Sequence, residues 1–189
     1  VVCHVLEIEG GTKQCELHKR IFTEADPTAV VSFNYDLIAD QSLLALEKLN
    51  WRSSDYKCAT HALVPTDSGR SYYKPIKRRS DKTSVPLLKL HGSMHYEKLL
   101  RGTGFRLSGV TLPDRAMPTF HYRKVPKAPY LIPPVASKIE IKQQELRDRW
   151  YTALDYLHDA PVWIFWGYSF PQTDTISQVL FRTALARNR

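Results

Sequence analysis

The chain has 189 residues, of which 43% are hydrophobic and 11% aromatic, and its formal net charge is +8. This length and composition suit one globular domain that can bury a substantial core. No apolar run approaches the about 18 residues that a membrane-spanning helix needs. The three cysteines, Cys3, Cys15 and Cys58, include no Cys-x-x-Cys pair. We therefore expect a single soluble, cytoplasmic domain over residues 1–189, without a disulfide framework or a bound metal.

The positive charge is concentrated in the middle of the chain. Residues 51–130 carry a formal charge of +11, whereas the rest of the chain carries −3. The densest basic stretch runs from Arg70 to Lys82. Such a stretch is compatible with a solvated loop, which is the plainer interpretation, or with a surface that binds phosphates or nucleic acid.

The N-terminal part of the chain predicts one strand followed by one helix. Residues 1–22 show no clear pattern, because Gly10 and Gly11 interrupt their apolar run. The β-branched run Val30–Phe33 predicts a strand, and apolar residues at helical spacing predict a helix over about Leu37–Leu49.

Two stretches of the middle resemble insertions around a second strand. Residues 51–86 are polar and basic and predict little regular structure apart from a short strand at His61–Val64. The apolar run Leu87–Leu90 predicts the second strand. Residues 97–135 are rich in glycine and proline, which favours a long loop over the edge of the sheet.

The C-terminal part predicts a helix, a strand and another helix. Apolar spacing over Glu140–His158 indicates an amphipathic helix, and Val162–Trp166 reads as a buried parallel strand. A last helix is expected over about Asp174–Ala186, with a core face formed by Ile176, Val179, Leu180 and Thr183. Alternating strands and helices indicate an α/β fold with a doubly wound, Rossmann-like parallel sheet.

Polar clusters follow each of the three predicted strands. The first is Ser32–Asp36, the second is His91–Ser93, and the third is Gly167–Ser169 with Asp174 a few residues on. In an open α/β sheet, ligands bind outside the carboxyl ends of the parallel strands. We therefore expect the three clusters to form one site.

The sequences SFNYD, KLHGS and WGYSFPQTD, with Ile132-Pro133-Pro134 before the last, resemble the SIR2-like branch of the sirtuin superfamily. The resemblance covers about residues 30–185 and is best known from NAD-consuming bacterial defence proteins. It implies an NAD+ hydrolase in anti-phage defence, with NAD as the substrate, acting as a homo-oligomer or with an activating protein partner. The zinc cysteines that sirtuin deacetylases usually carry after the His-Gly strand are absent, because no cysteine follows Cys58.

Two parts of such a domain are missing from the sequence. No Gly-x-Gly-x-x-Gly or Gly-Ala-Gly follows a clear strand near the start, and no strand follows the last predicted helix. We therefore expect this chain to be an internal portion of a longer SIR2-like domain, lacking the first Gly-rich βα unit and the last strand. Alone, it should bind NAD poorly.

The chemistry of the clusters suits cleavage of the bond between nicotinamide and ribose. Positive charge builds on the ribose as nicotinamide leaves, so the site needs a positioned water and a base with a pKa near neutral. His91 has the right residue type for the base, since histidine has an unperturbed pKa of about 6.5. Asn34 can orient a water or a ribose hydroxyl, and Asp36 can favour the developing positive charge.

The resemblance assigns further roles. It matches Asn34 and His91 to the catalytic pair of the family, Gly167 and Ser169 to the loop that holds the ribose and phosphate, and Asp174 to a nearby polar position. We add the neighbouring residues of the same clusters to the expected NAD site, namely Ser32, Gly92, Ser93 and Tyr168.

Plainer explanations and other functions stay open. Asp36 and Asp174 can serve only as helix N-caps, Asn34 as a turn residue, and His91 as a partly buried, hydrogen-bonded histidine. The alternative functions are a non-catalytic module that binds NAD, ADP-ribose or a protein partner, a protein deacylase, and a nucleic-acid binder that uses the basic middle of the chain.

Overall fold

Four helices and two small sheets make up the part of the chain that the computed structural model describes, which is residues 15–46, 59–65, 71–75, 85–98, 105–107, 129–132 and 144–187. The helices are α2 (Glu16–Ala25), α3 (Ile38–Leu44), α4 (Gln144–Asp159) and α5 (Thr175–Arg187). This mixture of helices and sheets agrees with an α/β class. Within the described ranges, no helix has the length and apolarity needed to cross a membrane.

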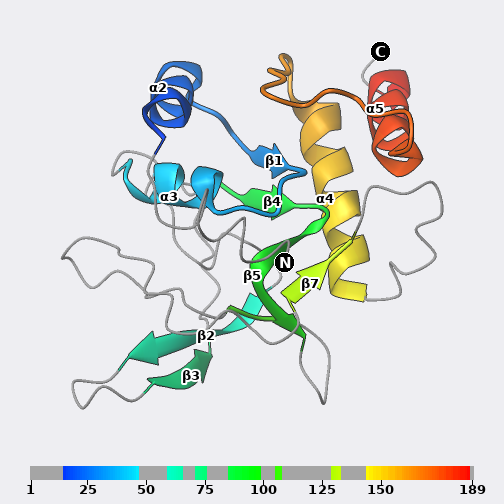
Figure 1. The fold of residues 1–189 in the computed structure, drawn as a ribbon. Coiled ribbons are helices and arrows are strands. Elements are labelled where there is room, and N and C mark those ends of the chain that lie inside the picture. The colour runs from blue at the N-terminus through cyan, green and yellow to red at the C-terminus, as the bar shows by residue number, and fades with distance from the viewer. Residues whose placement is uncertain are drawn as a thin grey trace.

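The first two predicted strands are confirmed as parallel neighbours. β1 (Val30–Ser32) pairs with β4 (Leu87–Lys89) in a two-stranded sheet. The Val30 amide donates to the Pro86 carbonyl and the Leu90 amide to the Ser32 carbonyl, both at 2.9 Å. Figure 1 shows the two strands with α3 on one side and α4 on the other. The carboxyl ends of both strands therefore lie at one edge of this sheet.

A buried apolar cluster joins this sheet to the C-terminal helices. It contains Leu88, Leu90, Ile132, Leu146, Trp150, Ala153 and Leu180. The predicted helices α4 and α5 are confirmed, with bounds close to those expected. The core face of α5 is shifted, however: its buried residues are Ser177, Leu180, Phe181 and Ala184. Val179, expected in the core, is 60% exposed, because α5 turns Phe181 toward the aromatic rings that follow α4.

The described parts of the two insertions contain more strand than the sequence led us to expect, whereas the rest of both insertions lies outside the described residues. The described parts contribute to a second sheet with strand order β3-β2-β6-β5-β7. Its strands are β2 (Ala59–Pro65), β3 (Ser71–Pro75), β5 (Gly92–Lys98), β6 (Phe105–Leu107) and β7 (Pro129–Leu131). β2 includes the short strand expected at His61–Val64.

The prolines in the strands of the second sheet occupy positions that a sheet tolerates. Pro65 and Pro75 end β2 and β3, and Pro129 begins β7, which lies at the edge of the sheet. Proline is confined to such positions because it has no amide proton to donate to a ladder. Two of the pairings, β2 with β6 and β5 with β7, also join residues that lie far apart in the sequence, so a local pattern could not reveal them. Only 71–75 of the basic stretch Arg70–Lys82 belongs to the described residues.

The third predicted strand is also wrong. Residues Val162–Trp166 form neither a helix nor a strand, and the exposed fractions of Val162 and Ile164 are 72% and 63%. A pocket separates this segment from β1, so the two backbones form no ladder. Instead, its aromatic rings pack on α5, with Trp163 and Phe165 both in contact with Phe181. Aromatic contacts with α5, and not pairing within a sheet, therefore hold this segment in place.

A fully buried ion pair ties α3 to β4. Nζ of Lys89 lies 2.9 Å from Oδ2 of Asp40, and neither side chain is exposed. The same ammonium donates to the Asp36 carbonyl. Buried charges are tolerated only when they are paired and hydrogen-bonded. The Lys89 ammonium meets this condition, because the Asp40 carboxylate pairs with it and the Asp36 carbonyl accepts a hydrogen bond from it. The pair therefore fixes the start of α3, and with it the segment after β1, against the end of β4.

Breaking this pair should destabilise the fold. Asp40→Ala leaves a buried, unpaired ammonium, so we expect the free energy of unfolding to fall by about 3–5 kcal/mol. Replacing both partners by apolar residues, Asp40→Leu with Lys89→Met, should cost less, because no charge is then left unpaired. Urea denaturation followed by circular dichroism measures both. Glu24→Ala, which breaks the exposed pair with Arg20, is the control and should change stability little. Equal losses in the single and double variants would contradict this account.

Candidate functional site

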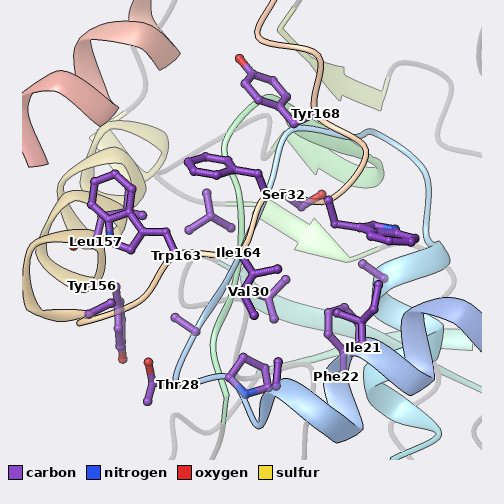
Figure 2. Close-up of a pocket in the computed structure, with 18 of the residues that line it drawn as sticks. Ile21, Phe22, Thr28, Val30, Ser32, Tyr156, Leu157, Trp163, Ile164 and Tyr168 are labelled. Carbon is purple, nitrogen blue, oxygen red and sulfur yellow. Dashed lines mark hydrogen bonds between the residues drawn. The ribbon is translucent and has the colours of Figure 1, made fainter. Parts of the chain in front are cut away.

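A pocket of about 410 Å³ lies between β1, α2 and residues 160–168. Its walls are mainly apolar: Ile21 and Phe22 of α2 lie on one side, and Leu157 and Trp163 lie on the other, with Val30 of β1 between them (Figure 2). The volume lies within the range of about 300–1,000 Å³ that is typical of small-molecule sites. The pocket can therefore accommodate an apolar or aromatic part of a ligand.

Two of the three predicted clusters contribute to the lining of the pocket. Ser32 ends β1, Asn34 and Asp36 follow it, and Gly167 and Tyr168 follow the segment opposite. Asn34 is exposed, and its backbone amide donates to the Ser32 hydroxyl at 3.3 Å. This combination of an apolar interior with a few polar groups is what orients a bound ligand.

Asp36 combines pocket lining with a structural role. Its Oδ1 accepts the Ile38 amide at 3.0 Å, which satisfies one of the free amides at the start of α3. Leu37 rather than Asp36 occupies the N-cap position. Asp36 therefore helps to cap α3, as expected, although it lies one residue before the N-cap position.

His91 pairs with Asp174 beneath the surface. Its Nε2 lies 3.2 Å from Oδ2 of Asp174, and the exposed fractions of the two side chains are 3% and 0%. The backbone of His91 is held in turn, since its carbonyl accepts the Ile132 amide at 2.8 Å. Asp174 immediately precedes α5. The end of β4 therefore meets the segment before α5.

Two aromatic rings lie where the pocket and the His91–Asp174 pair meet. Phe33 stacks on Tyr168 with ring centroids 4.4 Å apart, and both residues line the pocket. Phe33 also contacts the His91 ring at 5.3 Å, and the Tyr168 hydroxyl donates to Asp174 at 3.1 Å. Neither His91 nor Asp174 lines the pocket. The stacked rings thus stand between the open pocket and the buried pair.

Two tyrosines near Asp174 titrate abnormally. Burial raises the pKa of Tyr35 above its usual range, and the negative charge of Asp174 adds to that shift. Burial likewise raises the pKa of Tyr168, against the effect of a hydrogen bond with Ser177 and with the support of Asp174. The Tyr35 hydroxyl donates to the Ile132 carbonyl. Both side chains therefore act as neutral hydrogen-bond donors.

The remaining predicted residues lie in the second sheet or on the surface. Gly92 and Ser93 begin β5 rather than a loop. Ser93 is buried and its hydroxyl donates to the Tyr35 carbonyl at 3.2 Å, so it supports the turn after β1. Ser169 is exposed and does not line the pocket. Its place in an NAD site stays a prediction.

Sequence reasoning missed several residues that build this site. Phe33, Trp150 and Phe181 surround the cluster of rings, and the Ser177 hydroxyl donates to Asp174 at 2.5 Å. The spacing of Ser177 three residues after Asp174 on a helix was the available signal. The aromatic contacts had none, because their partners come from β1, α4 and α5.

Comparison with known proteins adds no family assignment: no protein-family model and no curated protein matches the chain. In the part of the chain that the structure describes, no cluster of three or more His, Cys, Asp or Glu side chains could hold a metal ion. The inference of function therefore rests on the geometry above and on the resemblance of the motifs.

Two glycines of the site have positive φ angles but very different surroundings. At Gly92, with φ +86°, an added Cβ would lie 2.1 Å from the Tyr130 carbonyl oxygen. At Gly167, with φ +64°, an added Cβ would meet nothing within 4 Å. Only Gly92 therefore combines backbone strain with a steric clash.

Alanine substitutions should separate these two effects. Gly167→Ala should cost about 1–2 kcal/mol, the usual price of a left-handed conformation. Gly92→Ala should cost more, because the backbone of β7 must also move away from the turn that holds His91. Thermal and urea denaturation of both variants measure the difference. Equal stabilities would show that the approach of Tyr130 to Gly92 is not a constraint.

His18 of α2 lines the pocket and has a lowered pKa. Burial lowers the pKa of His18 below its usual 6.5, although the charge of Asp36 acts in the opposite direction. Its ring contacts Phe22 and Trp166 edge to face at 6.0 and 6.3 Å. The neutral imidazole therefore packs as part of an apolar wall.

This pKa predicts a loss of stability in acid. Because the pKa of His18 is lower in the folded state than in the unfolded state, the unfolded chain binds a proton more readily. The stabilising contribution is complete above about pH 6.5 and is lost as the pH falls through the pKa of the folded state. His18→Gln cannot titrate, so its stability should fall less between about pH 7 and 5. Parallel curves for the two proteins, measured by urea denaturation, would contradict the prediction.

Proposed function

We propose that the chain carries an NAD+ hydrolase site of the SIR2-like type, built on a doubly wound, Rossmann-like sheet and serving anti-phage defence. The observation that supports this most is the meeting of the three motif segments. Asn34 and Asp36 follow β1, His91 follows β4, and Asp174 from the last motif contacts His91 at 3.2 Å. Isolated helix caps and turn residues would have no reason to converge in this way.

In this proposal the pocket holds part of NAD and the polar edge acts on the ribose. The Asn34 amide, exposed beside the pocket, orients a water or a ribose hydroxyl. Asp36 stabilises positive charge that develops on the ribose. His91 removes a proton from the attacking oxygen. Because Phe33 and Tyr168 separate His91 from the pocket, these rings must move apart when the substrate binds.

A second candidate has one observation in its favour. His91 is only 3% exposed and lies outside the pocket, which suits a structural histidine in a module that binds NAD or ADP-ribose without hydrolysis. In this case the ligand would contact the pocket residues alone. An activating protein partner or a homo-oligomer is proposed in both cases. Because the two candidates differ in whether NAD is hydrolysed, NAD binding and NAD turnover must be measured separately.

Substitution of the proposed pair tests the hydrolase. General-base catalysis is typically worth about 10²–10⁴-fold, so His91→Ala and Asn34→Ala should each lower nicotinamide release by at least about that factor. The double variant should be little worse than either single variant, because groups that act as a unit are not additive. The assay measures nicotinamide release by the purified full-length protein in its activated state, with NAD binding followed by calorimetry.

The control for this experiment is His158→Ala, which removes a 42% exposed imidazole from α4. It should release nicotinamide at the wild-type rate. Circular dichroism should show that each variant keeps its fold. Wild-type release by His91→Ala would exclude His91 as the base. NAD binding without any turnover in the activated wild-type protein would instead support the binding module.

A further inference from the structure

The contact between His91 and Asp174 bears on which nitrogen of the imidazole carries a proton. Nε2 of His91 lies 3.2 Å from Oδ2 of Asp174, and both side chains are buried. A carboxylate accepts hydrogen bonds and cannot donate them. A neutral imidazole that donates to this carboxylate carries its proton on Nε2. In the neutral ring, Nδ1 is then the nitrogen that can accept a proton.

Other donors hold the Asp174 carboxylate in place. The same Oδ2 accepts the Ser177 hydroxyl at 2.5 Å and the Tyr168 hydroxyl at 3.1 Å. Ser177 lies on α5 and Tyr168 lies before it, so the carboxylate is held from two sides. A ligand contact, the role expected from the sequence, does not account for a carboxylate oxygen that is enclosed by three side chains of the protein.

A helix cap alone does not account for it either. Asp174 stands directly before α5, and its carbonyl accepts the Gln178 amide at 3.2 Å. That backbone contact needs no particular side chain, and asparagine caps helices about as well as aspartate does. The buried contact with a histidine at the end of β4 is a separate feature. Asp174→Asn therefore removes the charge while leaving the capping ability.

We infer that Asp174 is the positioning residue for His91: it holds the imidazole in the tautomer protonated at Nε2 and leaves Nδ1 as the base. The catalytic consequence of this arrangement rests on the proposed NAD+ hydrolase function. The arrangement itself does not, because the tautomer is a property of the folded protein without NAD. A similar carboxylate–imidazole pair sets the tautomer in serine proteases, where replacing the aspartate with asparagine leaves the geometry intact but gives the wrong tautomer.

The test is the tautomer of His91, read from the ¹⁵N chemical shifts of both ring nitrogens in the full 189-residue chain. The signals are assigned with His91→Gln. The wild-type protein should show a proton on Nε2. In Asp174→Asn the amide can donate to Nε2, so the proton should move to Nδ1. Nicotinamide release by this variant should fall by about 10²–10⁴-fold with little change in KM.

The matched control makes the same substitution beside another histidine. Oδ1 of Asp159 lies 2.6 Å from Nδ1 of His158 on the surface of α4. Asp159→Asn should leave the tautomer of His91 and the release of nicotinamide unchanged. A second variant, Ser177→Ala, removes one donor to Asp174 but keeps the charge, so it should keep the proton on Nε2.

Two results would overturn the inference: a wild-type His91 protonated at Nδ1, or an Asp174→Asn variant that folds and keeps its proton on Nε2. The wild-type spectrum alone decides the first, so the test stands even if the variant does not fold. A tautomer that moves as expected in a protein without NAD turnover would support the positioning role of Asp174 and count against the hydrolase.

Discussion

The parallel pairing of β1 with β4 determines where the site residues that follow these two strands lie, because it places the ends of both strands at one edge. Lys89, the last residue of β4, strengthens this constraint. Its buried ammonium binds Asp40 of α3 and the Asp36 carbonyl. The segment that carries Asn34 and Asp36 is therefore tied to the strand that precedes His91. Since the pair is fully buried, the loss of either partner leaves the other as an unpaired buried charge.

Around this edge, polar and apolar functions are separated. The pocket is open and mainly apolar, whereas the His91–Asp174 pair is buried and satisfied by protein groups. The stacked rings of Phe33 and Tyr168 touch both. For chemistry on a ligand, the pocket and the His91–Asp174 pair would have to be connected. Movement of the Phe33 and Tyr168 rings could connect them. Binding without chemistry would need only the pocket. The arrangement thus makes the position of two aromatic side chains the feature that distinguishes the two proposed functions.

The segment Val162–Trp166 shows how composition and structure can diverge. Its apolar residues predict a buried strand, yet the segment is exposed beside the pocket and is held by rings of α5 and by the Trp163 indole, which donates to the Leu157 carbonyl at 2.8 Å. A strand exists only where a neighbouring backbone completes its ladder. An apolar run indicates that burial is favourable, but it does not provide the neighbouring strand. The second sheet shows the reverse case, in which polar and proline-containing stretches became strands because partners were available.

The sequence by itself determined the local features. Val30–Phe33 and Leu87–Leu90 were recognisable as strands, and α4 and α5 as helices, because their apolar periodicity depends only on neighbouring residues. The sequence also placed polar residues at the strand ends. The tertiary structure alone decided that α5 turns Phe181 inward, that β2 pairs with β6 and β5 with β7 in the second sheet, and that Asp174 contacts His91. Each of these depends on contacts between residues far apart in the chain, which no local pattern encodes. The residue types of the site were therefore readable in advance, but their division between an open pocket and a buried pair was not.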